Sequence, residues 1–115
     1  MTDLTSIFKL LSDETRLRML LLLFQEDLCV CELAGIIGSP QPRISKNLSK
    51  LRDMMLVTDA RKEKYVFYHL KTENEILMRT LQSILDDIDQ FPVLAKDSAM
   101  LDQRDQYMSI CQINA

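Results

Sequence analysis

Residues 39–55 read SPQPRISKNLSKLRDMM, and this stretch decides the fold. Ser39 is a residue type that caps helix N-termini, and prolines such as Pro40 and Pro42 are tolerated in a first helical turn. Apolar residues then recur at spacings of four, three and four, which predicts one buried helix face: Ile44, Leu48, Leu51 and Met55. The opposite face carries Arg43, Lys46, Asn47 and Lys50. A helix over about 39–55 divided in this way can rest on a core and lie in a DNA groove.

The residues before this stretch predict three short helices. The first contains Leu4, Ile7, Phe8 and Leu11; the second is capped by Ser12 and buries Leu17, Leu20, Leu21 and Phe24; the third runs from about Cys29 to Ile37 and ends at Gly38. After the stretch the period changes. Residues 56–60 and 65–70 are β-prone, and Arg61-Lys62-Glu63-Lys64 joins them, which predicts a basic-tipped hairpin over about 56–70.

The C-terminal part of the chain predicts a pairing helix. Thr72 and Glu75 form a capping box for a helix over about 72–91, and Phe91-Pro92 ends it. Its apolar residues repeat at four and three, the spacing of helices that pair lengthwise: Leu77, Leu81, Ile84, Ile88 and Phe91. A weaker helix follows to about residue 108, and 109–115 are expected to form a flexible tail. The expected fold is therefore mainly α with a small β-hairpin wing, a winged helix-turn-helix that forms a homodimer through its terminal helices.

Size and composition limit the function classes. A chain of 115 residues, 47% of them hydrophobic, suits one soluble domain over 1–115. The longest apolar run, Met19 to Phe24, is too short to cross a membrane, and no secretory signal opens the chain, so we expect a cytoplasmic protein with no membrane partner. Its three cysteines are then expected to be thiols. There is one histidine, no Ser-His-Asp pattern and no phosphate-cradling glycine loop, so we do not expect an enzyme.

Charge is distributed unevenly along the chain. Residues 40–71 hold eight basic and three acidic residues, a net charge of +5, although the whole chain carries −3. Residues 72–115 hold three basic and eight acidic residues, a net charge of −5. A basic middle between acidic flanks indicates a nucleic-acid face on a scaffold that does not bind nucleic acid itself. On charge alone, an ordinary solvated surface would explain the pattern as well.

Three segments of the chain match a known family. They are Phe8-Lys-Leu-Leu-Ser-Asp-Glu-Thr-Arg16, Leu28-Cys-Val-Cys-Glu-Leu33 and Gln41-Pro-Arg-Ile-Ser-Lys-Asn-Leu48, with residues 64–70 fitting as the wing. On these segments the chain resembles the ArsR/SmtB family of metal-sensing repressors. The narrower Leu-Cys-Val-Cys-Glu-Leu segment resembles the branch that senses arsenic and antimony. The resemblance implies double-stranded operator DNA as partner and As(III) or Sb(III) as inducer, without an organic cofactor.

The resemblance also implies which residues contact DNA. The family's second helix of the turn enters the major groove, which by position implicates Gln41, Arg43, Ser45, Lys46 and Asn47, with Lys50 on a phosphate. Arg61, Lys62 and Lys64 would reach the backbone or minor groove from the wing. Family members usually carry histidine where Asn47 stands, so we expect a different operator preference.

By itself the pair Cys29 and Cys31 would be better explained as two small buried hydrophobic residues, but within the segment Leu28–Leu33 that carries the resemblance it indicates a site for a soft ion. Thiolates select soft, thiophilic ions, and a thiol at a helix N-terminus is expected to have a lowered pKa, which favours Cys29 as a ligand. Residues i and i+2 lie roughly 200° apart on a helix, so joint binding by Cys29 and Cys31 should unwind the helix start and re-aim the outward-basic helix. Relatives carry a third cysteine where Ala34 stands here, which leaves Cys111, from either subunit, as the remaining thiol.

Other functions remain open on the sequence. A cadmium- or lead-responsive repressor could use the same thiols, and a redox or persulfide sensor could oxidise them. A zinc site of the usual type is hard to assemble with His69 as the single imidazole. A protein-interaction module without DNA binding would not need the basic outer helix and wing.

Overall fold

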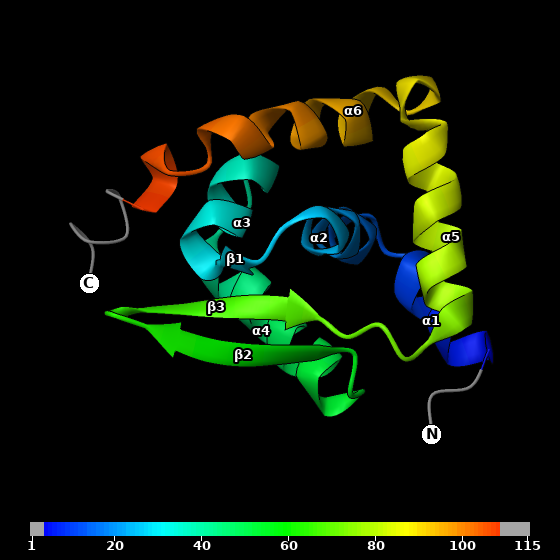
Figure 1. Ribbon diagram of the computed structural model, residues 1–115, viewed down its shortest axis with the longest axis horizontal. Coiled ribbons are helices and arrows are strands. Elements are labelled where there is room, and N and C mark those ends of the chain that lie inside the picture. Colours follow the sequence, from blue (N-terminus) through cyan, green and yellow to red (C-terminus); the bar gives the residue numbers. More distant parts are fainter. Residues whose placement is uncertain (1–3, 109–115) are drawn as a thin grey trace.

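One helix, α2 (Glu14–Gln25), lies at the centre of the molecule, and the other elements surround it (Figure 1). The computed structural model describes residues 4–108. Its other elements are α1 (Leu4–Leu11), β1 (Leu28–Cys29), α3 (Val30–Ile37), α4 (Gln41–Asp53), β2 (Val57–Lys62), β3 (Tyr65–Leu70), α5 (Glu75–Asp86) and α6 (Pro92–Ala99), with 3₁₀ turns at Ile88–Gln90 and Met100–Gln103. This order confirms the predicted fold class, a mainly helical chain with a β wing. No helix in this part of the chain has the length and apolar character to span a bilayer.

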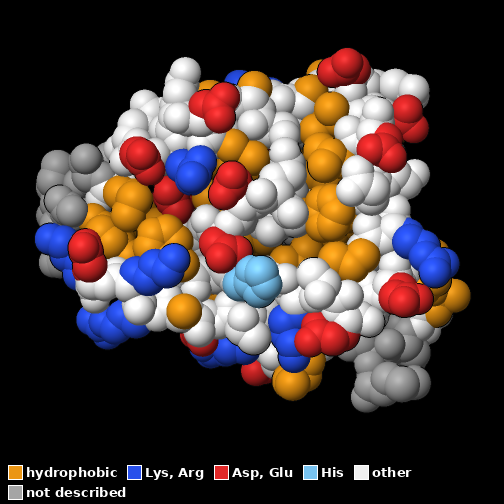
Figure 2. Space-filling model, viewed as in Figure 1, with side chains coloured by type: hydrophobic (Ala, Val, Ile, Leu, Met, Phe, Trp, Pro, Cys, Tyr) orange, Lys and Arg blue, Asp and Glu red, His pale blue; other side chains and the backbone are white. Residues whose placement is uncertain are grey.

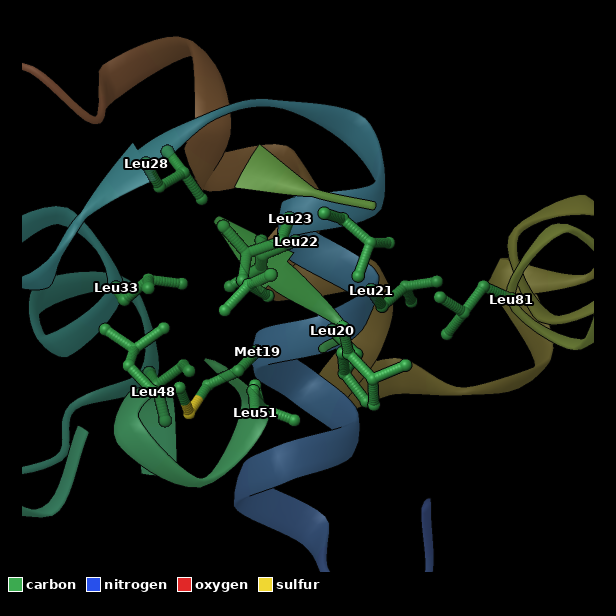
Figure 3. Close-up of a cluster of buried hydrophobic side chains, with 14 of the residues drawn as sticks. Met19, Leu20, Leu21, Leu22, Leu23, Leu28, Leu33, Leu48, Leu51 and Leu81 are labelled. Atoms are coloured by element: carbon green, nitrogen blue, oxygen red, sulfur yellow. The ribbon is translucent and has the colours of Figure 1, made fainter. Parts of the chain in front are cut away.

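The hydrophobic core is built around α2. Five consecutive residues, Met19 to Leu23, are each at most 3% exposed, so the helix is covered on all sides and not only along the predicted stripe. Figure 3 shows leucines reaching these residues from four other elements: Leu28, Leu33, Leu48, Leu51 and Leu81. Burying a leucine side chain contributes about 1.5–3 kcal/mol, so these contacts fix β1, α3, α4 and α5 to one centre.

The wing contains one strand more than the sequence predicted. β2 and β3 form the expected hairpin, in register from Val57 opposite Leu70 to Lys62 opposite Tyr65. The two-residue strand β1 adds to the other edge of β3, with Cys29 opposite Phe67, and gives the order β1-β3-β2. The hairpin turn lacks a glycine, and Glu63 takes a positive φ of 57° there. β1 therefore joins the wing directly to the start of α3.

Three helix caps differ from prediction. Asp13, not Ser12, caps α2, because its carboxylate accepts the N–H of Arg16 at 3.0 Å. Asn74, not Thr72, caps α5 by accepting the N–H of Leu77 at 3.0 Å. α4 begins after Pro40, and the predicted cap Ser39 has a buried hydroxyl with no hydrogen-bond partner among the described residues. In each case the capping residue lies next to the helix's first residue, one or two positions later than predicted.

The ends of two predicted helices also differ. α4 ends at Asp53, so Met55 is 68% exposed with a φ of 63° and does not extend the buried face. α5 ends at Asp86 instead of continuing to 91. Leu77 and Leu81, predicted for a pairing face, are fully buried in the chain's own core. The chain then turns, and α6 runs back across the molecule next to α2 (Figure 1).

Candidate nucleic-acid interface and thiol site

The turn between α3 and α4 is set by a glycine. Gly38 adopts a φ of 75°, a conformation that costs glycine little, and its N–H donates to Ala34 O at 2.8 Å. α4 then begins with prolines at positions where no intrahelical N–H is needed. Ile44, Leu48 and Leu51 are fully buried and hold α4 on the core, as predicted. The two helices therefore form a helix-turn-helix with a fixed outer face on α4.

The outer face of α4 presents the side chains that the sequence implicated in DNA contact. Arg43, Ser45, Lys46 and Lys50 are exposed, and Gln41 and Asn47 are half-buried. The amide of Asn47 donates to Arg43 O, one helical turn earlier, at 3.0 Å. This bond uses one of the two N–H donors of the Asn47 amide and leaves the other N–H and the amide oxygen for a base edge.

The basic residues of the wing point to different sides. Adjacent strand residues face opposite sides of a sheet, so the exposed side chains of Arg61 and Lys62 diverge. Lys62 lies 5.7 Å from the centre of the Phe67 ring, whereas Arg61 donates to Glu63 O at 3.3 Å. Arg52 of α4 pairs with Asp59 of β2 at 3.0 Å and so links the outward helix to the wing. Lys64 is exposed in the turn itself.

Sequence reasoning missed two basic residues beside α4. Lys9 of α1 and Arg16 of α2 line a surface cleft of about 310 Å³ together with Lys50. The guanidinium of Arg16 donates to Leu10 O at 3.3 Å, which holds it at the cleft. No local pattern marks these residues, because the cleft exists only after α1 and α2 pack beside α4. Three cations from three helices make a cleft suited to an anionic group such as a phosphate.

Cys29 lies at the junction of the wing and α3. It is the last residue of β1 and the N-cap of α3, and it is 3% exposed. Its N–H donates to Glu32 Oε1 at 3.0 Å, which completes a capping box. The expectation of a lowered pKa is wrong: burial raises the pKa of the Cys29 thiol above its ordinary value and outweighs the neighbouring backbone N–H groups that favour the thiolate.

Cys31 lies in the first turn of α3, and its neighbours differ from those of Cys29. It is 4% exposed and lines a surface pocket of about 260 Å³ at the start of α4. The pocket is also lined by Ala34, Gly35, Ser39, Pro40, Gln41 and Tyr107. Cys111 lies outside the described residues. Within residues 4–108, no group of three or more His, Cys, Asp or Glu side chains is arranged to hold a metal ion.

The donor chemistry of the two cysteines fits a soft ion better than a hard one. Cys29 carries a free thiol, whereas Cys31 is disulfide-bonded, which corrects the expectation that the cysteines are all thiols. Once that disulfide is reduced, the pair offers two sulfur ligands, which soft ions prefer. Both cysteines are buried, so an ion can reach the two sulfur atoms together only after the disulfide of Cys31 is reduced and the first turn of α3 opens. Any such opening also breaks the bond between the Cys29 N–H and Glu32.

A second hollow, of about 640 Å³, lies between the wing and the C-terminal segment. Acidic and basic side chains form about half of its lining: Glu26, Asp27, Glu32, Lys62, His69, Arg104 and Asp105. His69, the one histidine of the sequence and pale blue in Figure 2, contacts Asp27 Oδ1 through Nδ1 at 2.7 Å. Figure 2 shows acidic and basic side chains interspersed on this face. Lys62 faces this hollow, so its contact with DNA stays a prediction.

The sequence is similar to bacterial regulators of metal and metalloid resistance. It is 46% identical over 68 residues to the arsenic resistance transcriptional regulator ArsR1 of Pseudomonas putida, covering 58% of this chain and 53% of that protein. It is 42% identical over 83 residues to ArsR2 of the same organism, covering 67% of this chain and 72% of that protein. It is 38% identical over 70 residues to the cadmium resistance regulatory protein CadC of Listeria innocua, covering 60% and 59%. The chain thus spans only a little over half of ArsR1 and CadC.

Solved structures with the same fold are also repressors or regulators. The antimony-specific transcriptional repressor AntR has a TM-score of 0.64 and 30% identity, covering 75% of this chain and 77% of that chain. The repressor BigR from Xylella fastidiosa has a TM-score of 0.61 and 29% identity, covering 68% and 78%. The homodimeric winged helix-turn-helix domain Mb0332 from Mycobacterium bovis has a TM-score of 0.58 and 26% identity, covering 73% and 76%.

The fold and the outward-basic α4 define a winged helix-turn-helix regulator, a class without catalytic chemistry. The family model for bacterial regulatory proteins of the arsR family matches residues 13–59, which span α2, α3, α4 and the start of β2. The chain belongs to the ArsR family. Its relatives are transcriptional regulators, which agrees with the expectation that it is not an enzyme.

Proposed function

We propose that this chain is a homodimeric repressor that binds operator DNA and is released when As(III) or Sb(III) binds its cysteine thiolates. One observation carries the proposal most directly. Cys29 caps α3, which packs against α4, so a ligand that draws Cys29 and Cys31 together acts on the helix that supports the proposed DNA-contacting helix. The similarity to arsenic-resistance regulators and to an antimony-specific repressor supports the choice of ion.

The DNA contacts would be divided between α4 and the wing. Gln41, Arg43 and Asn47 are the candidates for base edges, because arginine can pair with guanine and amides with adenine. Ser45, Lys46 and Lys50 would bind phosphates, together with Arg61, Lys62 and Lys64 of the wing. The cleft formed by Lys9, Arg16 and Lys50 would add phosphate contacts beside α4.

The dimer would form at the end of the molecule that carries α1 and α5, away from the wing tip (Figure 1). Three large apolar side chains are about half-exposed there: Leu4, Phe8 and Ile76. Exposed apolar side chains gathered on one end favour a protein partner, and a second copy would present the same set. Two copies would place two α4 helices on one operator.

Release follows from the positions of the two cysteines. Once a small-molecule thiol has reduced the disulfide of Cys31, each As–S bond replaces one hydroxide of arsenite, which leaves as water with the thiol proton. Because Cys29 lies before the first turn of α3 and Cys31 lies within it, binding both requires that turn to open. α3 packs against α4, so its distortion would move α4 relative to the wing. Cys111 is the candidate for a third thiolate.

The test is fluorescence anisotropy on labelled DNA from upstream of the protein's own gene, with arsenite added under reducing conditions. We expect salt-sensitive binding that micromolar arsenite reverses in the wild type but not in Cys29→Ser/Cys31→Ser. Cys111→Ser alone would show whether a third thiolate is needed. Binding that ignores arsenite but yields to cadmium, as similarity to CadC would allow, or to a persulfide donor would refute the metalloid part. The absence of binding at low salt would refute the repressor.

A further inference from the structure

The C-terminal segment, residues 92–108, does not extend away from the domain but lies along α3. Its helix α6 contacts α2, and the chain then continues past α3 towards the tip of the wing (Figure 1). The segment acts at three places that matter for the proposed DNA interface. It reaches the end of α3 indirectly, through Arg18 of α2, and it contacts α3 nearer its start and the strand β3 directly.

The first contact holds the C-terminal end of α3. Asp97 of α6 forms a bidentate pair with Arg18 of α2, at 2.8 Å to Nε and 2.9 Å to Nη2. The same Nη2 donates to Ile37 O at 3.2 Å, and Ile37 is the last residue of α3. The side chains of Asp97 and Arg18 are 4% and 19% exposed, so this pair is shielded from water. It therefore fixes α6 next to the turn that leads into α4.

The second contact holds the first turns of α3. Arg104 Nε lies 3.8 Å from Glu32 Oε2, and the other oxygen of Glu32 accepts the Cys29 N–H. Arg104 also lies 3.8 Å from Glu26 Oε2, at the end of α2. Tyr107 packs its ring against Gly35 so closely that a Cβ added at Gly35 would overlap the ring. The glycine of α3 is thus the place where the segment lies directly on the helix.

The third contact reaches the wing. The hydroxyl of Tyr65, the first residue of β3, donates to Met108 O at 3.3 Å. Within five residues, the segment therefore touches the helix that carries Cys31 and the strand that pairs with Cys29. The segment thus connects α3 with the wing, and the proposed DNA contacts require that these two parts keep a fixed position relative to each other.

We propose that residues 92–108 form a brace that holds α3 in its DNA-binding position, with Arg104 and Tyr107 as its positioning residues. This inference rests on the proposed function, because the brace opposes the opening of α3 that the proposed release requires. The first turn of α3 cannot open without separating Glu32 from Arg104 or moving Tyr107 from Gly35. Loosening the brace therefore weakens DNA binding in the absence of inducer. It also lowers the arsenite concentration that releases the protein that still binds DNA.

The test compares Tyr107→Ala with Tyr107→Phe, which keeps the ring and removes only the hydroxyl, and Arg104→Ala with Arg104→Lys, which keeps the charge. Hydrogen exchange of the α3 amides reports the brace without any DNA, and the α5 amides serve as an internal reference. We expect both alanine variants to speed α3 exchange at least about tenfold, with α5 unchanged and the two conservative variants close to wild type. DNA anisotropy should show a loss of affinity of about tenfold for the same two variants.

The outcomes distinguish a failure of the proposed brace from a failure of the proposed repressor function. If α3 exchange in both alanine variants equals that in the conservative variants, the brace is wrong, whatever happens with DNA. If α3 exchange rises in the alanine variants but the wild type binds no DNA, the brace is supported as a structural element and its role in DNA binding is overturned. Gly35→Ala provides an independent variant that leaves the Tyr107 side chain intact. Its added methyl group displaces the Tyr107 ring, so the α3 amides should exchange faster.

Discussion

Replacing Arg18 with alanine should lower the free energy of unfolding more than replacing its partner Asp97. In Arg18→Ala the Asp97 carboxylate, 4% exposed, loses both guanidinium bonds and stays largely shielded from water. Leaving a buried charge unpaired costs about 3–5 kcal/mol, and we expect about 3 kcal/mol here because Arg18 itself is 19% exposed and water can follow its removal. For a domain of this size that loss corresponds to a fall in melting temperature of about 12 °C.

The reverse substitution should be milder for a physical reason. In Asp97→Ala the flexible Arg18 side chain can keep its bond to Ile37 O and turn its remaining donors to water, so we expect a loss of about 1.5 kcal/mol. The double variant should cost no more than Arg18→Ala alone, because no unpaired charge is left. The matched control is Arg79→Ala, since the Arg79–Glu75 pair is 74% and 80% exposed and should contribute less than about 0.5 kcal/mol.

Urea unfolding followed by far-ultraviolet circular dichroism measures the four variants and the wild type, with an unchanged slope as the check that only stability has changed. The reasoning fails if Arg18→Ala loses less than about 1 kcal/mol, or if Asp97→Ala is the more damaging of the two.

Three further outcomes are expected. Lys46→Ala should weaken binding to every DNA sequence and reduce the slope of log affinity against log salt concentration by about one. The control Lys96→Ala, at an exposed position of α6, should change neither quantity. Equal effects of the two substitutions would show that α4 is not in the interface. Phe8→Asp should shift the sedimentation coefficient from dimer to monomer, whereas a monomeric wild type would contradict the proposed dimer end. In a Cys31→Ser/Cys111→Ser chain, Cys29 should react with iodoacetamide at least about tenfold more slowly than in urea, because burial raises its pKa and so lowers the thiolate fraction at a given pH; equal rates would show that the thiol is open to solvent.

The sequence was sufficient to predict the parts of the fold that depend on local periodicity. The buried face of α4 followed from the spacing of Ile44, Leu48 and Leu51, a pattern that lies entirely within this helix. Leu77 and Leu81 were predicted for the pairing face of α5, but they satisfy the same spacing by packing in the chain's own core. Periodicity identifies an apolar face but does not say which surface covers it. The carboxylates at Asp86 and Asp87 also oppose the negative end of the helix dipole, which is consistent with the helix ending there.

The features that the sequence did not reveal depend on residues far apart in the chain. The strand β1 is two residues long and is a strand only because β3, almost 40 residues later, pairs with it. The same pairing buries Cys29, so the local effect of the helix N-terminus on its pKa is outweighed by a tertiary one. The cleft of Lys9, Arg16 and Lys50 and the contact of Tyr107 with Gly35 likewise arise from packing between elements.

The double role of Cys29, last residue of β1 and cap of α3, leaves no linker between the sheet and the helix. An insertion or deletion of one residue at this position could not be absorbed by a loop. It would either move the pairing of β1 with β3 by one residue, which turns every β1 side chain to the opposite face, or rotate α3 by about 100° relative to the core. Length changes should therefore be tolerated in the exposed turn at Glu63-Lys64 and not at residues 28–30. Any engineered variant of this chain must change the chemistry at position 29 while keeping the length of the chain there.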